Sequence, residues 1–378
     1  MTKVLFVTHT AAPSGAELAT LRLAISLHDI DVGAVFTEDG PMVARMRAQG
    51  IDTVVLRNTF DSRSITIANR TPRRLICGFV GLVKLGWGVG AAARDFGATV
   101  LVAESTKALV VAAVAARRAH LPLVWHVHDR ISVAYFGRIL SVLIRMFGWV
   151  FSRGYIANSR STMSLLFTWR RESLVAYPGV LLDDLDDRED QRDPTETIVA
   201  VVGRLTPWKG QDLFLRALAD VTVRPRLVYL VGGTFFDEEP FRDELRRLTA
   251  TLDLPVTFTG HVDNPGVFMG RADILVHCSV VAEPFGQVVV EGMHAGCAVI
   301  ATQPGGTTEI VDSGVNGLLV DGGDQQQLTD ALNILIGDRE LRQRLSVAGR
   351  LRASQFDVCV SARAVGLFLE DIASRVAK

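Results

Sequence analysis

The stretch Glu283-Pro-Phe-Gly286-Gln-Val-Val-Val-Glu291 is the most informative part of the chain for both fold and chemistry. Pro284 and Gly286 predict a tight loop, and the residues that follow predict the start of a helix. The first N–H groups of a helix are unpaired and lie at its positive end, so this position suits a phosphate. Glu283 precedes the helix start and Glu291 follows it. Carboxylates accept hydrogen bonds from paired hydroxyls, so the stretch predicts a site for a sugar or ribose diol.

Short apolar runs alternate with helical patterns throughout the second half of the chain. The expected strands are residues 197–202, 226–231, 256–259, 274–277, 298–301 and 317–320. Each is followed by a loop and a segment with apolar residues at helical spacing. This alternation predicts a doubly wound α/β domain with a parallel sheet.

The first half repeats the pattern. Its expected strands are residues 4–7, 32–36, 99–102, 123–128 and 154–157, and the acidic, turn-prone interval 181–197 predicts a linker. The length of 378 residues also favours two domains, which we place at 1–182 and 196–361. Ligands of such sheets bind outside the carboxyl ends of the strands, so we expect a cleft at these ends.

Two further loops of the second half carry candidate ligand-binding residues. In Gly203-Arg204-Leu-Thr-Pro-Trp-Lys209-Gly210, the arginine fork and the mobile lysine charge suit a diphosphate. The alternative is a surface loop with two solvated cations. Gly305-Gly306-Thr-Thr-Glu309 is expected to line the same cleft, or else to form an ordinary glycine turn with a helix cap.

In the first half, the loop Ala11-Ala-Pro-Ser-Gly15-Ala-Glu17 joins a strand to a helix start. It lacks the G-x-G-x-x-G pattern, so nothing supports a nicotinamide cofactor. Strand alternation places His126 and His128 on one face. Further ligands nearby in sequence are missing, so we expect no metal.

Charge is distributed unevenly along the chain. Residues 1–180 hold 21 Lys and Arg against 11 Asp and Glu, and the remainder holds 19 against 30. The basic half predicts an anionic partner, such as a phosphorylated acceptor or a lipid surface; the alternative is solvated surface charge. Aromatic residues do not interleave with its arginines, which argues against nucleic acid.

The apolar segment 138–153 has two interpretations. It predicts either a core helix with one wet edge or a helix on a membrane surface, with Arg138 and Arg145 on one face meeting lipid phosphates. Because the chain has four scattered cysteines, no signal peptide pattern and no run of 18 apolar residues, we expect a cytoplasmic protein, peripheral at most to the membrane.

Together these motifs resemble glycosyltransferase family 4, a group of retaining enzymes with the GT-B fold. The resemblance rests on the Gly-Ala-Glu loop, His128-Asp129, Ala157-Asn-Ser159, Tyr177-Pro-Gly-Val180, Gly-Arg-Leu with Lys-Gly, Glu-Pro-Phe-Gly with Glu291, and Gly-Gly with Asn316-Gly-Leu-Leu319. It implies two Rossmann-like domains facing across a cleft, with a C-terminal helix from 362–378 crossing back onto the first domain.

The resemblance also implies residue roles. Arg204 and Lys209 would neutralise the diphosphate, Glu291 would hold the ribose, and Glu283 would hold the donor sugar. His128 would lie near the transferred sugar and Gly15 near the donor phosphate. The implied catalytic residues are His128, Glu283, Arg204 and Lys209. The implied donor site comprises Gly15, Gly203, Arg204, Lys209, Val262, Glu283, Phe285, Gly286, Gln287, Val288 and Glu291. Secondary candidates are His126, Asp129 and Glu309.

The implied function is transfer of a sugar from a nucleoside diphosphate, most often UDP and otherwise GDP, to an acceptor hydroxyl with the anomeric configuration retained. The acceptor would be a glycan or a lipid-linked molecule, and no metal or other cofactor would be needed. The alternatives are an inactive partner that binds nucleotide or glycan, and a nucleotide-sugar epimerase.

Overall fold

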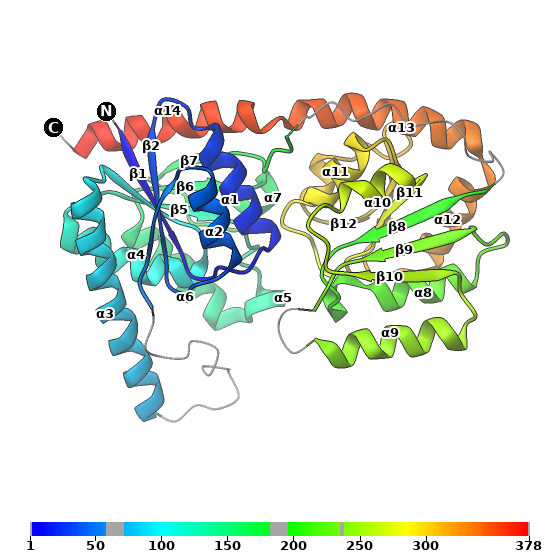
Figure 1. The fold of residues 1–378 in the computed structure, drawn as a ribbon, viewed down its shortest axis with the longest axis horizontal. Helices are drawn as coiled ribbons and strands as arrows, with labels where there is room; N and C mark the ends of the chain where they lie inside the picture. Colours follow the sequence, from blue (N-terminus) through cyan, green and yellow to red (C-terminus); the bar gives the residue numbers. More distant parts are fainter. Residues whose placement is uncertain (1, 58–71, 182–195, 235–237, 377–378) are drawn as a thin grey trace. The chain divides into compact units, whose positions relative to one another are not determined.

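The computed structural model describes residues 2–57, 72–181, 196–234 and 238–376. Most of the interval interpreted as a linker, residues 182–195, lies outside the described residues. The chain divides into two compact units: unit 1 contains Met1–Gly179 and Val358–Lys378, and unit 2 contains Val180–Asp357. Each unit is an α/β domain built on its own parallel sheet (Figure 1).

The sheet of unit 1 has seven parallel strands in the order β3-β2-β1-β4-β5-β6-β7. The strands are β1 (Lys3–Thr8), β2 (Asp31–Phe36), β3 (Asp52–Val55), β4 (Val100–Ala103), β5 (Leu123–Val127), β6 (Gly154–Ala157) and β7 (Glu172–Val175). The helices are α1 (Gly15–Ser26), α2 (Pro41–Ala48), α3 (Pro72–Phe96), α4 (Thr106–Ala119), α5 (Val133–Phe136), α6 (Arg138–Phe151), α7 (Arg160–Met163) and α14 (Val358–Val376).

Alternation along the strands of unit 1 supplies both faces of the sheet with apolar side chains. Val4 and Phe6 pack in a core with α1, α2 and α14. Leu5 and Val7 pack in a second core, on the other face, with α3 and α4. A strand buried on both faces reads as a continuous apolar run, which is why these strands are recognisable from the sequence.

The sheet of unit 2 has six parallel strands in the order β10-β9-β8-β11-β12-β13. The strands are β8 (Ile198–Val202), β9 (Leu227–Val231), β10 (Val256–Gly260), β11 (Ile274–His277), β12 (Ala298–Gln303) and β13 (Leu318–Asp321). The α-helices are α8 (Gln211–Ala219), α9 (Glu239–Thr251), α10 (Gly266–Arg271), α11 (Gln287–His294), α12 (Gln325–Gly337) and α13 (Arg339–Ala353). Short 3₁₀ turns occupy Pro207–Lys209, Gly306–Glu309 and Ser354–Phe356.

The expected fold class, two doubly wound α/β domains, is confirmed, and the ends of the expected strands differ from those observed by at most two residues. Two short strands, β3 and β7, were not expected. Both lie at edges of the sheet in unit 1 and are half exposed, so neither shows a continuous apolar run.

The chain leaves unit 1 after Gly179 and returns to it at Val358, and these two segments run side by side. A Cβ on Gly179 would lie 2.2 Å from Cα of Val358, so only glycine permits this approach. The returning helix α14 buries Ala362, Val365 and Leu369 in the core of unit 1. Figure 1 shows it in red beside the blue N-terminal elements.

Helix α6 packs on unit 1 along one face, with Ile144, Phe147 and Phe151 partly buried against the core. Gly148 is buried against the ring of Trp125, where an added Cβ would lie 2.5 Å from Cζ3. Ser141 is also fully buried, whereas most apolar residues of α6 are exposed. The interpretation of this segment as a core helix with one wet edge is therefore wrong. Among the described helices, none has the length and apolar character needed to cross a membrane.

The packing of Gly148 on Trp125 gives a stability prediction. Gly148→Ala places a methyl group inside contact distance of the ring, and we expect it to lower the free energy of unfolding by about 1–3 kcal/mol. Gly270→Ala, in α10, is the control because no atom lies within 4 Å of its added Cβ. Thermal unfolding followed by near-ultraviolet circular dichroism compares them. A midpoint for Gly148→Ala at or above that of Gly270→Ala contradicts the prediction.

Candidate functional site

The order of strands reverses beside the first strand of each sheet. In unit 1 the reversal lies between β1 and β4, and in unit 2 between β8 and β11. The loops after these two neighbouring strands turn to opposite faces of the sheet. Side chains of the two loops therefore face one another at the carboxyl ends of the strands. In both units the structure places buried ionisable residues at this point.

In unit 2, Lys209 and Glu283 meet at this reversal. Lys209 ends the 3₁₀ turn that follows β8, and Glu283 lies in the loop after β11. Nζ of Lys209 is 2.8 Å from Oε2 of Glu283, and the two side chains are only 17% and 12% exposed. The two sequence motifs that predicted a diphosphate and a sugar are thus brought into direct contact.

Two further side chains orient the carboxylate of Glu283. The hydroxyl of Ser279 donates to Oε2 at 2.8 Å, and Nε2 of His277 lies 3.1 Å from the same oxygen. Nδ1 of His277 in turn lies 3.2 Å from the hydroxyl of Thr302. Within the described residues, all these contacts of Glu283 reach Oε2, which leaves Oε1 as an acceptor for a ligand hydroxyl.

The surroundings hold Glu283 in its ionised form. Burial alone would raise the pKa of this carboxyl, but the charge of Lys209 and the hydrogen bond from His277 outweigh burial and hold the pKa well below its usual range. The group is therefore a fixed hydrogen-bond acceptor at neutral pH and a poor source of protons.

Glycines allow the backbone to close around this carboxylate. The N–H of Gly306 donates to the carbonyl of Glu283 at 2.8 Å, and a Cβ on Gly306 would lie 2.4 Å from the carbonyl oxygen of Pro284. Gly286, at φ 103°, adopts the left-handed conformation and forms the N-cap of α11. The N–H groups at the start of α11 thus begin directly after the loop that carries Glu283.

The other expected donor residues of unit 2 follow neighbouring strands. Arg204, after β8, pairs with Glu238 at 3.2 Å between Nε and Oε1. Glu291 lies in α11 and accepts a hydrogen bond from Gln287 at 2.7 Å. Val262 follows β10, and Glu309 ends the 3₁₀ turn after β12. The structure therefore places these residues after β8, β10, β11 and β12.

In unit 1 a buried cluster forms around Glu104, which follows β4. Nε2 of His128 lies 2.9 Å from Oε2 of Glu104, and Nδ1 of His126 lies 3.1 Å from the same oxygen. The hydroxyl of Thr20, in α1, donates to Oε2 at 2.5 Å. All four side chains are more than nine-tenths buried. The expected placement of His126 and His128 on one face is confirmed, with ring centroids 4.0 Å apart.

This cluster shifts the pKa values of its two histidines in opposite directions. Burial lowers the pKa of both histidines, and for His126 the lowering prevails. For His128 the hydrogen bond and charge of Glu104, together with Glu17 and Asp129, raise the pKa above its usual value. The two histidines counter the burial of Glu104 and hold its pKa far below the usual range. Burial raises the pKa of Glu17, which lies in the first turn of α1.

Two imidazoles and a carboxylate are also a set of ligands that divalent metals use. The sequence argument against a metal relied on the lack of a further ligand near His126 and His128, and the structure corrects that premise by adding Glu104. The nitrogen–oxygen distances of 2.9–3.1 Å are those of hydrogen bonds. The expectation that no metal is needed stays a prediction.

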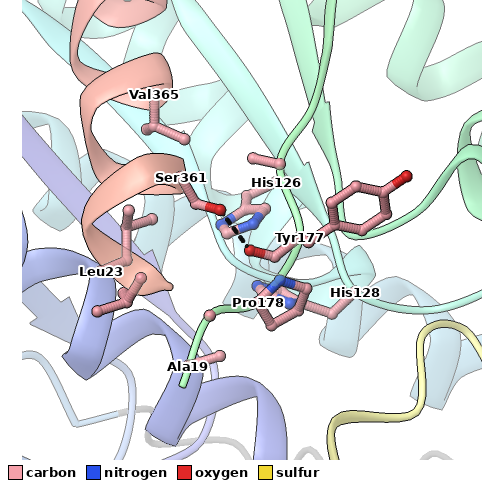
Figure 2. Close-up of a pocket in the computed structure, with 11 residues that line it drawn as sticks. Ala19, Leu23, His126, His128, Tyr177, Pro178, Ser361 and Val365 are labelled. Carbon is pink, nitrogen blue, oxygen red and sulfur yellow. Dashed lines mark hydrogen bonds between the residues drawn. The ribbon is translucent and has the colours of Figure 1, made fainter. Parts of the chain in front are cut away.

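A small cavity lies beside this cluster within unit 1. Figure 2 shows His126 and His128 facing it, between the segment Tyr177-Pro178 and helix α14. The hydroxyl of Ser361 in α14 donates to the carbonyl of Tyr177 at 2.7 Å and closes one side. The cavity therefore joins the histidines to the point where the chain returns to unit 1.

Sequence reasoning missed Glu104, His277 and Ser279. Glu104 is the first charged residue after an apolar strand that neighbours β1, and His277 and Ser279 end or follow the strand that neighbours β8. A search for polar residues at the ends of these particular strands would have identified all three, but it requires the strand order.

The chain is similar to known glycosyltransferases. A model of the family described as glycosyl transferases group 1 matches residues 183–352. The chain is 34% identical over 170 residues to D-inositol 3-phosphate glycosyltransferase of Nocardia farcinica, covering 43% of this chain and 38% of that protein. It is 33% identical over 193 residues to lipopolysaccharide core biosynthesis glycosyltransferase LpsD of Rhizobium meliloti, covering 50% and 54%. The chain thus spans about half or less of these curated relatives.

A solved structure matches almost the whole chain. HepE of Anabaena, crystallised with UDP and glucose, superimposes with a TM-score of 0.84 at 27% identity, covering 98% of this chain and 100% of that chain. The same protein crystallised with UDP-glucose gives a TM-score of 0.83. The expected GT-B fold, with two Rossmann-like domains, is confirmed.

The Lys209–Glu283 contact gives a second prediction. Lys209→Met leaves a buried carboxylate without its cation, and we expect the free energy of unfolding at pH 7 to fall by on the order of 3 kcal/mol. Adding Glu283→Gln removes the unpaired charge and restores part of the loss. Urea unfolding of both variants measures the difference. If the double variant Lys209→Met with Glu283→Gln is no more stable than Lys209→Met alone, the prediction that the unpaired charge of Glu283 causes the loss is contradicted.

The same pair predicts a pH dependence. A carboxyl with a lowered folded-state pKa stabilises the protein above its unfolded value, about 4.5, and this contribution is lost as the pH falls towards the folded-state pKa. In Lys209→Met the pKa of Glu283 rises. The stability difference between wild type and this variant should therefore shrink as the pH falls below about 4.5.

The Glu104 cluster gives a third prediction. Glu104→Gln removes the charge that raises the pKa of His128, so burial prevails and we expect this pKa to fall below its wild-type value. Proton NMR titration of the histidine ring resonances measures this shift. Glu172→Gln is the control, because Glu172 is exposed and pairs with Arg375. An unchanged pKa of His128 in Glu104→Gln would show that Glu104 does not raise it.

Proposed function

We propose that this protein is a retaining glycosyltransferase of family 4 that takes a nucleoside diphosphate sugar as donor. The observation that carries the proposal is Glu283, a buried and ionised carboxylate whose Oε2 is fixed by Lys209, His277 and Ser279. Its Oε1 is left to accept a hydroxyl, directly before the N–H groups that begin α11. A sugar diphosphate requires an oxygen that accepts hydrogen bonds from its sugar hydroxyls and, beside it, N–H groups that donate hydrogen bonds to its phosphates.

The proposal assigns the donor to unit 2. The sugar hydroxyls bind Glu283, the diphosphate binds Lys209, Arg204 and the first N–H groups of α11, and the ribose binds Glu291. Arg204 would exchange its contact with Glu238 for the phosphate, because a carboxylate and a phosphate compete for the same guanidinium fork. UDP is the proposed nucleotide and glucose the first sugar to test, supported by HepE, which was crystallised with UDP-glucose.

The proposed chemistry needs no protein nucleophile and no metal. The leaving diphosphate helps to deprotonate the incoming acceptor hydroxyl on the same face of the sugar, so the anomeric configuration is retained. Lys209, Arg204 and the start of α11 stabilise the charge that grows on the leaving group. A fixed donor aimed at developing charge contributes about 3 kcal/mol to such a barrier.

The proposed acceptor is a glycan or a lipid-linked molecule bound by unit 1. The excess of 21 basic over 11 acidic residues in residues 1–180 favours an acceptor that carries phosphate. The names of the curated relatives refer to an inositol phosphate and to the core of lipopolysaccharide, which are a phosphorylated acceptor and a membrane glycan. For His128 and Gly15 the family resemblance implies roles toward the donor, and these stay predictions.

The test is donor binding followed by transfer. We expect UDP and its sugars to raise the unfolding temperature without added metal, since a ligand at 100 times its Kd adds about 2.7 kcal/mol of stability. Lys209→Ala should lose this shift, whereas Arg344→Ala, an exposed cation of α13, should keep it. Glu283→Gln should lower the transfer rate on the order of 100-fold while nucleotide binding survives.

The outcomes separate the candidate functions. Transfer to an acceptor with retained configuration, followed by NMR of the anomeric proton, supports the proposal. Binding of nucleotide without transfer to any acceptor of a glycan panel indicates the inactive partner, and conversion of the donor into its epimer indicates the epimerase. No stabilisation by any of UDP, GDP, ADP or dTDP and their sugars contradicts the donor site itself.

A further inference from the structure

Residues 130–171 form a continuous segment of one charge sign. The segment contains seven arginines, no lysine and no acidic residue, although Asp129 and Glu172 border it directly. It includes α5, α6, β6 and α7. The positive charge of unit 1 is therefore concentrated in one stretch of chain and is not balanced within that stretch.

Helix α6 presents an apolar stripe to the solvent. Ile139, Leu143, Met146 and Val150 are 78%, 55%, 50% and 50% exposed. Their spacing of four, three and four residues places them on one helix face. The opposite side of the helix holds the buried residues Ser141 and Gly148, so the stripe faces away from unit 1.

The stripe continues at both ends with exposed residues that suit a membrane interface. Val133 and Tyr135 of α5 precede it and are more than half exposed. At the other end the exposed Trp169 stacks on the partly buried Trp149 with ring centroids 6.1 Å apart, and Nε1 of Trp149 donates to the carbonyl of Trp169. The guanidinium of Arg170 lies 4.5 Å from the ring centre of Trp169. Tyrosine and tryptophan favour the level of the lipid headgroups because their rings are apolar and their polar atoms remain wet.

The arginines divide into anchoring and exposed residues. Arg145 donates from Nε to the carbonyl of Ile131 at 3.0 Å, so it fixes α6 to the loop before α5. The expectation that Arg138 and Arg145 together meet lipid phosphates is therefore wrong for Arg145. Arg138 at the start of α6 and Arg153 just beyond its end are exposed, and they flank the stripe.

From these observations we propose that α5 and α6 dock unit 1 on an anionic lipid bilayer. The apolar stripe enters the boundary between headgroups and acyl chains, and Arg138 and Arg153 bind lipid phosphates on either side. Charge decides between occupants of this face: a second copy would bring the exposed Arg138 and Arg153 against the same two arginines, with no carboxylate in the segment, whereas an anionic bilayer supplies the opposite charge. The proposal goes beyond the proposed transfer reaction and does not depend on it.

Vesicle binding tests the proposal on the full chain. Flotation with vesicles of 70% phosphatidylcholine and 30% phosphatidylglycerol is compared with flotation on phosphatidylcholine alone. We expect binding to the anionic vesicles that is at least tenfold stronger and weakens with salt, as about 1 kcal/mol per basic residue near an anionic surface implies. Equal binding to both vesicle types, or none to the anionic ones, overturns the proposal.

Matched variants separate the two parts of the surface. Ile139→Gln with Leu143→Gln, and Arg138→Gln with Arg153→Gln, should each weaken binding to anionic vesicles by about tenfold or more. The control, Val347→Gln with Leu351→Gln, changes two exposed apolar residues four apart on α13 of unit 2 and should bind like wild type. Circular dichroism verifies that each variant is folded. If the control variant and the stripe variant lose binding equally, the assignment of the membrane-binding surface to α6 is overturned.

A second copy of the chain as the occupant has its own signature. Analytical ultracentrifugation without lipid would then show a dimer that Ile139→Gln with Leu143→Gln converts to a monomer, and this result would overturn the proposal. We expect the same sedimentation for wild type and this variant. The rise in unfolding temperature caused by UDP is measured in parallel for each variant. Whether UDP stabilises the protein tests the proposed function and leaves the vesicle result unaffected.

Discussion

Both candidate sites depend on one constraint of parallel sheets. Where the strand order reverses, the crossover connections leave on opposite faces, and no helix covers the carboxyl ends of the two central strands. In unit 2 this point lies between β8 and β11, and in unit 1 between β1 and β4. Each holds a buried carboxylate, Glu283 or Glu104, whose partners come from both sides of the reversal. The reversal of strand order therefore explains why, in both units, a buried charged group lies at the carboxyl ends of otherwise apolar strands.

The two carboxylates are held differently, and the difference determines what each can do. Glu283 is ionised against Lys209 and keeps one oxygen for a ligand, so it acts as a fixed acceptor. Glu104 accepts a hydrogen bond from Thr20 and lies within hydrogen-bonding distance of His126 and His128, and its charge raises the pKa of His128.

Much of this could be predicted from the sequence, because strands buried on both faces are continuous apolar runs and because Glu-Pro-Phe-Gly and Gly-Arg-Leu fix loops at their ends. Glu104 and His277 could not be, since a single polar residue at a strand end has no pattern until the strand order is known. The sequence left two interpretations of α6 open, a core helix and a helix on a membrane surface. A helix that is apolar nearly all round usually indicates burial, and only the structure shows that most of its apolar residues are exposed.

The central claim is that a nucleoside diphosphate sugar binds at the reversal point of unit 2, with Glu283 on the sugar and Lys209 on the diphosphate. The most direct measurement is a crystal structure of the protein with UDP-glucose. We expect a sugar hydroxyl within hydrogen-bonding distance of Oε1 of Glu283 and a phosphate oxygen at the N–H groups that begin α11. Electron density for the nucleotide at another edge of the sheet, or a donor that leaves Glu283 without a ligand contact, would contradict it.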